Sequence, residues 1–232
     1  MKKFIGSLFL LTLALFPSRS DASTLCSLAT TCSFTLNSPG TIGSPGPFGL
    51  ITLDLMGNYQ NSGNTAIKFT INLNDTPAPV FLVNTGNDGN HAPFGFNYSG
   101  AGTVTLGSFS NTNFSQAGSA QDQSPFGTFN TAVTFNCQGG GSCGATSSNL
   151  LTFVAQTTSA GGFTNLGDVI NLSGPTAAYF TADIFYNGAT GVVGVTGGPN
   201  DTGNSPVPEP QSAAMLGAGL LALGFAARKF RK

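Results

Sequence analysis

The side chains that most often carry acid–base chemistry are scarce in this chain. His91 is its single histidine, so any Ser-His-Asp or Cys-His arrangement must be built on it. It lies in the stretch NTGNDGNHAPFG, whose glycines and asparagines are more typical of an exposed turn than of an active site. We therefore expect no catalytic role for His91.

Carboxylates are the second source of catalytic groups. Glycoside hydrolysis needs two acids held roughly 5–10 Å apart, and residues 23–205 contain seven aspartates and no glutamate. No two of these aspartates are two or three positions apart in the sequence, so their spacing identifies no candidate catalytic pair. We expect a protein that is not an enzyme, and an extracytoplasmic hydrolase stays as an alternative.

Oxygen-bearing side chains gather in the stretch from residue 75 to residue 90. Carboxylate and amide oxygens are the ligands that Ca²⁺ prefers, although the EF-hand spacing is absent. A calcium ion is therefore the one cofactor that we consider, with no other metal expected. Its candidate ligands are Asp75, Asn84, Asn87, Asp88 and Asn90.

Aromatic side chains are the usual platform for sugars, and the chain has four tyrosines and no tryptophan. Tyr59 and Tyr98 lie in loop-like stretches, so they are the predicted ligand contacts. Ordinary packing at a turn explains them equally well. Tyr179 and Tyr186 are weaker candidates, because they fall within a predicted strand.

The four cysteines form two Cys-x5-Cys pairs, Cys26 with Cys32 and Cys137 with Cys143. In an exported protein such residues are expected to form disulfides. We favour the two local bridges. In the loop-entropy model each of them lowers the entropy of the unfolded chain and so stabilises the fold by about 2.4 kcal/mol. Cross-pairing between the two motifs is the alternative, and a zinc site is not expected from this spacing.

Charge is rare between the two ends of the chain. Residues 23–205 carry Lys68 as their only basic side chain against seven aspartates, a formal charge of −6. A surface with one lysine cannot neutralise a row of phosphates, so nucleic acid is excluded as a partner.

The elements that must position these side chains are predicted to be strands. Short runs alternate between apolar and polar residues, glycines and prolines separate them, and no long run has helical periodicity. The pattern predicts about nine strands and an all-β fold, an antiparallel β-sandwich or jelly roll in which one face of each sheet meets water. The runs are CSFTLN, LITLDLM, AIKFTINL, PVFLVN, GTVTLG, TFNTAVTF, NLLTFVAQT, DVINL and AAYFTADIFY.

Register makes one local prediction. If residues 50–56 and 66–72 form a hairpin, Asp54 lies opposite Lys68, and such an exposed pair contributes less than about 1 kcal/mol.

The two ends of the chain differ from the domain expected at 23–205. Residues 1–22 combine Lys2 and Lys3, an apolar run from residue 4 to 16 and small residues at a cleavage site, which indicates a secretory signal helix. Residues 212–227 form an uncharged apolar segment of about 24 Å as a helix, short for a ~30 Å hydrocarbon core. We expect it to be a transmembrane helix whose basic flank stays cytoplasmic, that flank being Arg228, Lys229, Arg231 and Lys232.

The C-terminal segment 206–232 contains the motif Val207, Pro208, Glu209 and Pro210, followed by the apolar segment and the basic cluster. This ordered combination resembles the PEP-CTERM sorting signal of exported Gram-negative proteins. It implies that an exosortase in the membrane recognises the motif and processes the tail. It also implies a transient anchor in the inner membrane, followed by release to the cell surface or outside the cell.

These observations predict an exported structural or interaction protein of the cell surface or matrix, associated with exopolysaccharide or biofilm. A carbohydrate-binding module with a defined groove is the main alternative. The expected partners are an exosortase, exopolysaccharide and, before processing, the membrane.

Overall fold

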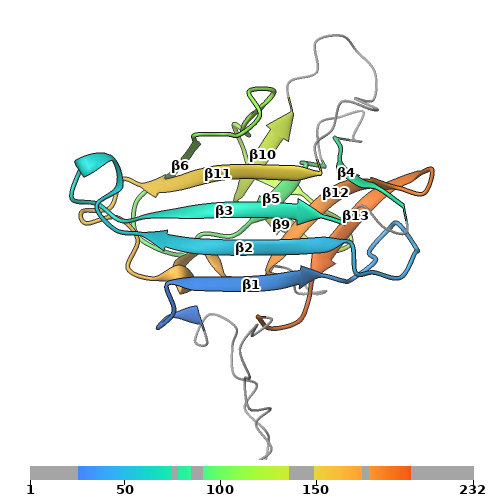
Figure 1. The fold of residues 1–232 in the computed structure, drawn as a ribbon, viewed down its shortest axis with the longest axis horizontal. Helices are drawn as coiled ribbons and strands as arrows, with labels where there is room; N and C mark the ends of the chain where they lie inside the picture. Colours follow the sequence, from blue (N-terminus) through green and yellow to red (C-terminus); the bar gives the residue numbers. More distant parts are fainter. Residues whose placement is uncertain (1–25, 75–77, 85–90, 136–148, 174–177, 200–232) are drawn as a thin grey trace, which may run out of the picture. The chain divides into compact units, whose positions relative to one another are not determined.

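Two antiparallel sheets form the domain in the computed structural model, which describes residues 26–74, 78–84, 91–135, 149–173 and 178–199 (Figure 1). The first sheet has the order β1-β2-β3-β11-β6. Its strands are β1 (Thr31–Leu36), β2 (Gly49–Met56), β3 (Ala66–Leu73), β11 (Leu150–Thr157) and β6 (Val104–Gly107).

The second sheet has the order β13-β12-β5-β10-β7, and β4 also pairs with β12. Its strands are β13 (Ala189–Val195), β12 (Phe180–Tyr186), β5 (Phe94–Phe96), β10 (Thr131–Phe135), β7 (Phe114–Gln116) and β4 (Val80–Leu82). A small ribbon of β8 (Gln121–Asp122) and β9 (Thr128–Phe129) and two 3-10 turns, η1 (Tyr59–Asn61) and η2 (Leu166–Val169), complete the described elements. The predicted antiparallel all-β sandwich is confirmed.

Phenylalanine side chains fill the space between the two sheets. The ring of Phe69 on β3 lies 4.7 Å from that of Phe96 on β5 and 4.8 Å from that of Phe153 on β11, measured between centroids. Phe34 on β1 meets Phe180 on β12 edge to face at 5.0 Å. Because aromatic rings bury the largest apolar areas of any side chains, this cluster is the main contact that holds the sheets together.

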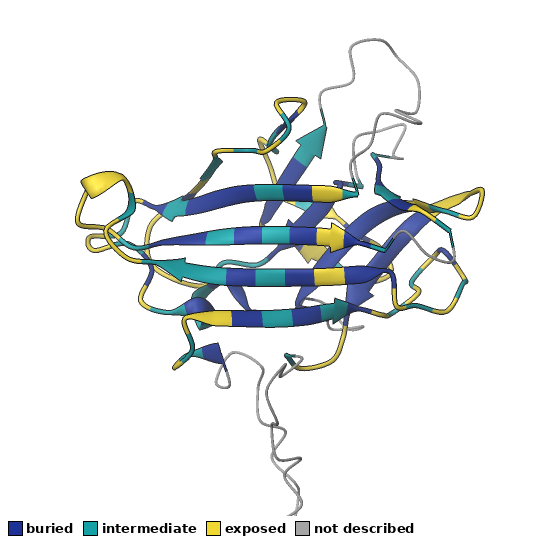
Figure 2. Ribbon diagram, in the orientation of Figure 1, coloured by how far each residue is buried: buried dark blue, intermediate teal, exposed yellow. Residues whose placement is uncertain are grey.

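The outer face of the first sheet is polar, as the alternation predicted. Ser33, Thr52, Thr70 and Thr152 are consecutive cross-strand partners on β1, β2, β3 and β11, and we call them the hydroxyl row. Their side chains are half-buried, and Figure 2 shows the resulting alternation of buried and more exposed residues along these strands. The Ser33 and Thr52 hydroxyls are hydrogen-bonded at 3.1 Å.

The outer face of the second sheet differs from the prediction, because it is covered. Thr181 and Asp183 point away from the main core, yet both are fully buried. The β8–β9 segment lies over this face, and Phe126 and Phe129 form a second apolar cluster there with Ala178 and Val192. A Cβ on Gly194 of β13 would stand only 2.8 Å from the Phe126 ring, so the cover is tightly packed.

One predicted strand is wrong. The run DVINL does not form a strand, because η2 occupies its start. The Asn165 side chain accepts a hydrogen bond from the Gly167 N–H at 2.7 Å, and the Asp168 carboxylate accepts one from the Thr164 N–H at 2.8 Å. Such local bonds from side chain to backbone compete with pairing in a sheet.

Two local predictions about pairs can be compared with the structure. Asp54 and Lys68 are directly opposite on β2 and β3, as predicted. Within the described residues they form no ion pair, and the Asp54 carboxylate instead accepts a hydrogen bond from the Thr31 hydroxyl at 2.8 Å. The Cys26–Cys32 bridge is present, with its Cα atoms 5.9 Å apart, while Cys137 and Cys143 lie outside the described residues.

The segments predicted as helices at the two ends also lie outside the described residues. Within the part of the chain that the structure describes, neither helical turn has the length and apolar character that a membrane span requires.

Candidate functional site

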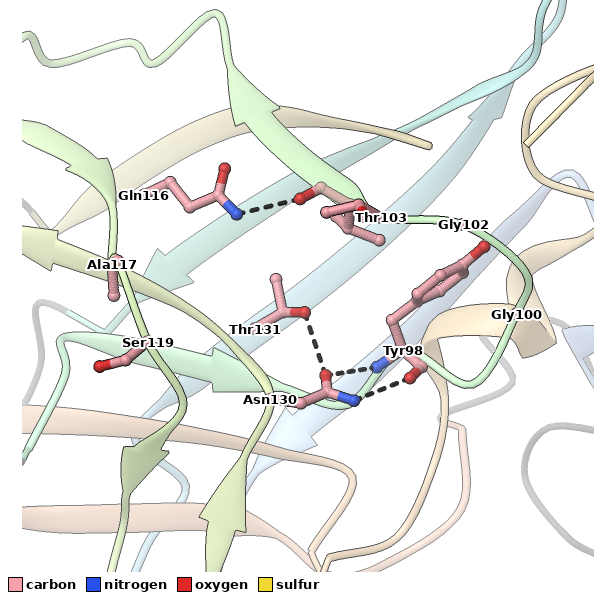
Figure 3. Close-up of a pocket in the computed structure, with 11 residues that line it drawn as sticks. Tyr98, Gly100, Gly102, Thr103, Gln116, Ala117, Ser119, Asn130 and Thr131 are labelled. Carbon is pink, nitrogen blue, oxygen red and sulfur yellow. Dashed lines mark hydrogen bonds between the residues drawn. The ribbon is translucent and has the colours of Figure 1, made fainter. Parts of the chain in front are cut away.

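A polar pocket lies next to β6 and β7, which are the last strands in the orders of the two sheets (Figure 3). Its volume is about 390 Å³, within the usual range for small-molecule sites. The lining residues are Tyr98, Gly100, Gly102, Thr103, Val104, Gln116, Ala117, Gly118, Ser119, Asn130 and Thr131.

Asn130 organises the floor of the pocket. It lies between β9 and β10, and its side chain forms hydrogen bonds with the loop that follows β5. The Asn130 Oδ1 accepts hydrogen bonds from the Tyr98 N–H at 2.9 Å and the Thr131 hydroxyl at 3.0 Å, while its Nδ2 donates to the Tyr98 carbonyl at 2.8 Å. This arrangement fixes the backbone of Tyr98 against the start of β10.

Tyr98 forms one wall, and its ring is held at both ends. The phenol donates to the Ala101 carbonyl and lies 3.1 Å from the Thr157 hydroxyl. The ring packs edge to face on Phe163, with centroids 5.6 Å apart. A Cβ on Gly100 would stand 2.6 Å from the Tyr98 ring, so only glycine lets the loop close over the ring. The Tyr98 ring is therefore fixed by contacts at its hydroxyl, its edge and its face.

Gln116 forms the opposite wall and joins the two sheets. Its Oε1 accepts from the Leu106 N–H at 2.9 Å, and its Nε2 donates to the Val104 carbonyl at 3.0 Å. Residue 116 belongs to β7 of the second sheet and residues 104 and 106 to β6 of the first. The side-chain amide thus takes the place of a backbone partner on the edge of β6.

The lining of this pocket is polar and uncharged. Among the eleven residues that line it there is no lysine, arginine, histidine, aspartate or glutamate. The amide nitrogens of Asn130 and Gln116 each carry two hydrogens and use one in the bonds above. Together with the exposed Ser119 and Thr103 hydroxyls, they suit a neutral ligand that carries several hydroxyl groups.

The structure brings one of the predicted sugar contacts to this pocket and leaves the others elsewhere. Tyr98 lines it. Tyr59 lies on η1, where its phenol is hydrogen-bonded to the Ser108 hydroxyl at 2.9 Å, and it is not among the lining residues. Tyr179 and Tyr186 pack against Phe34 and Phe48.

Asn130 and Gln116 were missed by the sequence reasoning. Gln116 ends β7, a three-residue strand that the alternation pattern did not reveal, whereas Asn130 lies inside the predicted strand run TFNTAVTF, which the structure divides into β9 and β10. The available signal was Asn130 itself, a turn-forming residue in the middle of that run.

The residues considered for catalysis or calcium do not line the pocket. Asn84 and His91 are half-buried and lie on either side of residues 85–90. Asp75, Asn87, Asp88 and Asn90 lie outside the described residues. In the described ranges no three His, Cys, Asp or Glu side chains come together as metal ligands.

Comparison with known proteins identifies one segment of the chain. Residues 206–232 match the family model of the PEP-CTERM protein-sorting motif. This match includes the predicted motif residues 207–210 and the basic cluster at 228–232, all of which lie outside the described residues. No curated protein and no solved structure gives a match to the chain. The motif indicates an exported protein that an exosortase sorts to the cell surface.

Proposed function

We propose that the sorting motif delivers a non-enzymatic interaction protein of the cell surface or matrix, and that its β-sandwich associates with exopolysaccharide in a biofilm. In this proposal the segment 212–227 anchors the chain in the inner membrane of a Gram-negative cell only until the exosortase has acted. Residues 23–205 then function outside the cell.

The observation that carries the proposal is the uncharged polar pocket at Tyr98 in an exosortase substrate. Neutral polysaccharides present hydroxyl groups and no charge. Amide and hydroxyl groups can donate to and accept from such ligands, whereas a pocket of fixed charges favours ionic ones. The rigid Tyr98 and Asn130 network lowers the ordering cost of binding.

The same pocket favours a second candidate, a carbohydrate-binding module that selects one sugar. In that case a single glycan class should bind through the pocket. A protein of general matrix association should instead retain several neutral polysaccharides.

The test is a pocket-blocking substitution with a matched control. A Cβ on Gly118 meets no atom within 4 Å and would lie at the lining of the pocket, so Gly118→Tyr should fill the space without disturbing the fold. A Cβ on Gly57, in the turn after β2, is equally free, which makes Gly57→Tyr the control.

The assay is binding of the full chain, purified in mild detergent, to a panel of immobilised neutral and acidic polysaccharides. We expect binding to neutral members, weakened more than about tenfold by Gly118→Tyr, a loss of about 1.4 kcal/mol, and unchanged by Gly57→Tyr. A blank panel, or equal binding by both variants, would count against the pocket. Turnover of a polysaccharide or ester by the wild type would contradict the non-enzymatic assignment.

The sorting route has its own test. The intact mass of the protein recovered from the cell surface should correspond to a chain without the C-terminal segment. A mass that retains residues 211–232 would indicate permanent anchoring.

A further inference from the structure

The pocket at Tyr98 offers a ligand more hydrogen-bond donors than unoccupied acceptors. Both side-chain amide oxygens are already used, because Asn130 Oδ1 accepts two hydrogen bonds and Gln116 Oε1 accepts one. The amide nitrogen of each residue donates once within the described residues and keeps a second hydrogen. These two side chains therefore present mainly donors to a ligand.

The backbone of the lining has the same bias. Four of its carbonyl groups accept hydrogen bonds from the protein, those of Tyr98, Thr103, Val104 and Ser119. Four of its N–H groups have no acceptor among the described residues, those of Gly100, Gly102, Gly118 and Ser119. A sugar hydroxyl in this pocket can accept from such a donor, but its own hydrogen finds few unoccupied acceptors.

Charge decides which kind of acceptor the pocket favours in a ligand. The lining has no lysine, arginine or histidine, and residues 23–205 carry a formal charge of −6. Lys68, the only basic residue in that range, lies opposite Asp54 on β3 and is not among the lining residues. A carboxylate that left water for this pocket would therefore lack the cationic partner that a desolvated charge requires. An uncharged carbonyl group fits the pocket better.

The apolar side chains of the lining leave room for a small group. They are Val104, Ala117 and the ring of Tyr98. Ala117 directly follows Gln116, and Figure 3 shows these two residues on one side of the pocket with the Tyr98 ring on the other. A methyl group can therefore pack here while a carbonyl oxygen beside it accepts from an amide.

We propose that the pocket recognises acetyl groups on a neutral polysaccharide, and this inference rests on the proposed function. The acetyl carbonyl accepts from the amide nitrogens of Gln116 and Asn130, and the methyl group packs against Ala117 and Tyr98. In an acetyl ester the acyl group replaces the hydroxyl hydrogen, so the ligand loses a donor that this pocket satisfies poorly and gains an acceptor. An N-acetyl amide presents the same carbonyl and methyl groups.

The experiment compares ligands that differ in acetylation, by isothermal titration calorimetry of the full chain in mild detergent. The first pair is an O-acetylated glucomannan and the same polymer after alkaline deacetylation. The second pair is chitohexaose and cellohexaose, which differ in the N-acetyl group. One further hydrogen bond and a packed methyl group should make binding about tenfold tighter in at least one pair. The pair that shows the gain identifies the linkage as an ester or an amide.

The outcomes separate this inference from the proposed function. Equal binding within both pairs would overturn acetyl recognition, while binding of neutral polysaccharides would leave the proposed function in place. Absence of binding to all four ligands and to the neutral members of the panel would contradict both.

A variant of the amide donor tests how the preference arises. Gln116→Met keeps the length of the side chain and removes the amide, so the preference for the acetylated ligand should fall below about threefold. Gln156→Met, at a half-buried position on β11 outside the lining, should keep it. If Gln116→Met does not fold in thermal melts, Gly118→Tyr takes its place and should abolish the preference. A full preference in the folded variant would refute recognition at this pocket.

Discussion

Phe69 is the side chain on which the packing of the two sheets depends most directly. Its ring is fully buried and lies within 4.7–6.4 Å, between centroids, of the rings of Phe94, Phe96, Phe153 and Phe180. Three of these rings belong to the opposite sheet. Phe69→Ala would therefore remove the centre of the contact between the sheets.

The expected cost follows from the burial and from the lost ring contacts. Phe→Ala in a core costs about 3–5 kcal/mol, and close ring pairs contribute about 0.5–1.5 kcal/mol beyond area burial. Phe69 has two ring neighbours closer than 5 Å, so we expect a value near the upper end, about 5 kcal/mol. This loss is comparable to the whole stability of many domains.

The assay is urea denaturation followed by far-UV circular dichroism, since the chain has no tryptophan. Phe69→Leu keeps most of the volume and should cost about 1.5 kcal/mol. Phe185→Ala, at a side chain that is 37% exposed, should cost about 1–2 kcal/mol. A Phe69→Ala cost below about 2 kcal/mol, or equal to that of Phe185→Ala, would refute the role of this ring.

Three further predictions concern the site, the disulfide and the tail. Tyr98→Phe should lower the free energy of unfolding by about 1 kcal/mol, measured in thermal melts. It should leave polysaccharide binding intact, because the Thr157 hydroxyl still donates to the Ala101 carbonyl at 3.1 Å. Complete loss of binding would show that the phenol touches the ligand. Replacing Cys26 and Cys32 by serine should cost about 2.4 kcal/mol in urea denaturation, and no change would mean that the bridge does not limit the unfolded chain. Glu209→Ala should leave the tail uncleaved, measured by intact mass, while Gln211→Ala should be processed normally; normal processing of Glu209→Ala would remove this residue from the recognised motif.

The sequence predicts this fold well wherever one face of a strand meets water. In β3 the alternation of Ile67, Phe69 and Ile71 with Lys68 and Thr70 matches the observed burial, and the same pattern predicts the Asp54–Lys68 register. It fails for the second sheet, because both faces of that sheet are covered. Thr181 and Asp183 look like solvent-facing positions in the sequence, and the β8–β9 segment, distant in the chain, packs with Phe126 and Phe129 over the face to which they project.

The alternation pattern also could not predict short or glycine-rich strands. β5 and β7 have three residues each, too few for a period to be seen. β13 has glycines at 191 and 194, where a Cβ would clash with Ile42 and Phe126, and these glycines interrupt the alternation by which a strand is predicted. The pocket is lined by Gln116 of β7 and by Tyr98, which follows β5, so the alternation pattern could not show that these two side chains and Asn130 lie together.

The hydroxyl row on the first sheet has a consequence for the environments in which the protein can work. Dissolved ions screen interactions between charges, and the screening length falls from about 30 Å at 0.01 M salt to about 3 Å at 1 M. Hydroxyl groups carry no net charge, and on the described strands of this sheet the two charged residues, Asp54 and Lys68, face each other. The hydration of this face should therefore stay nearly constant from fresh water to brine.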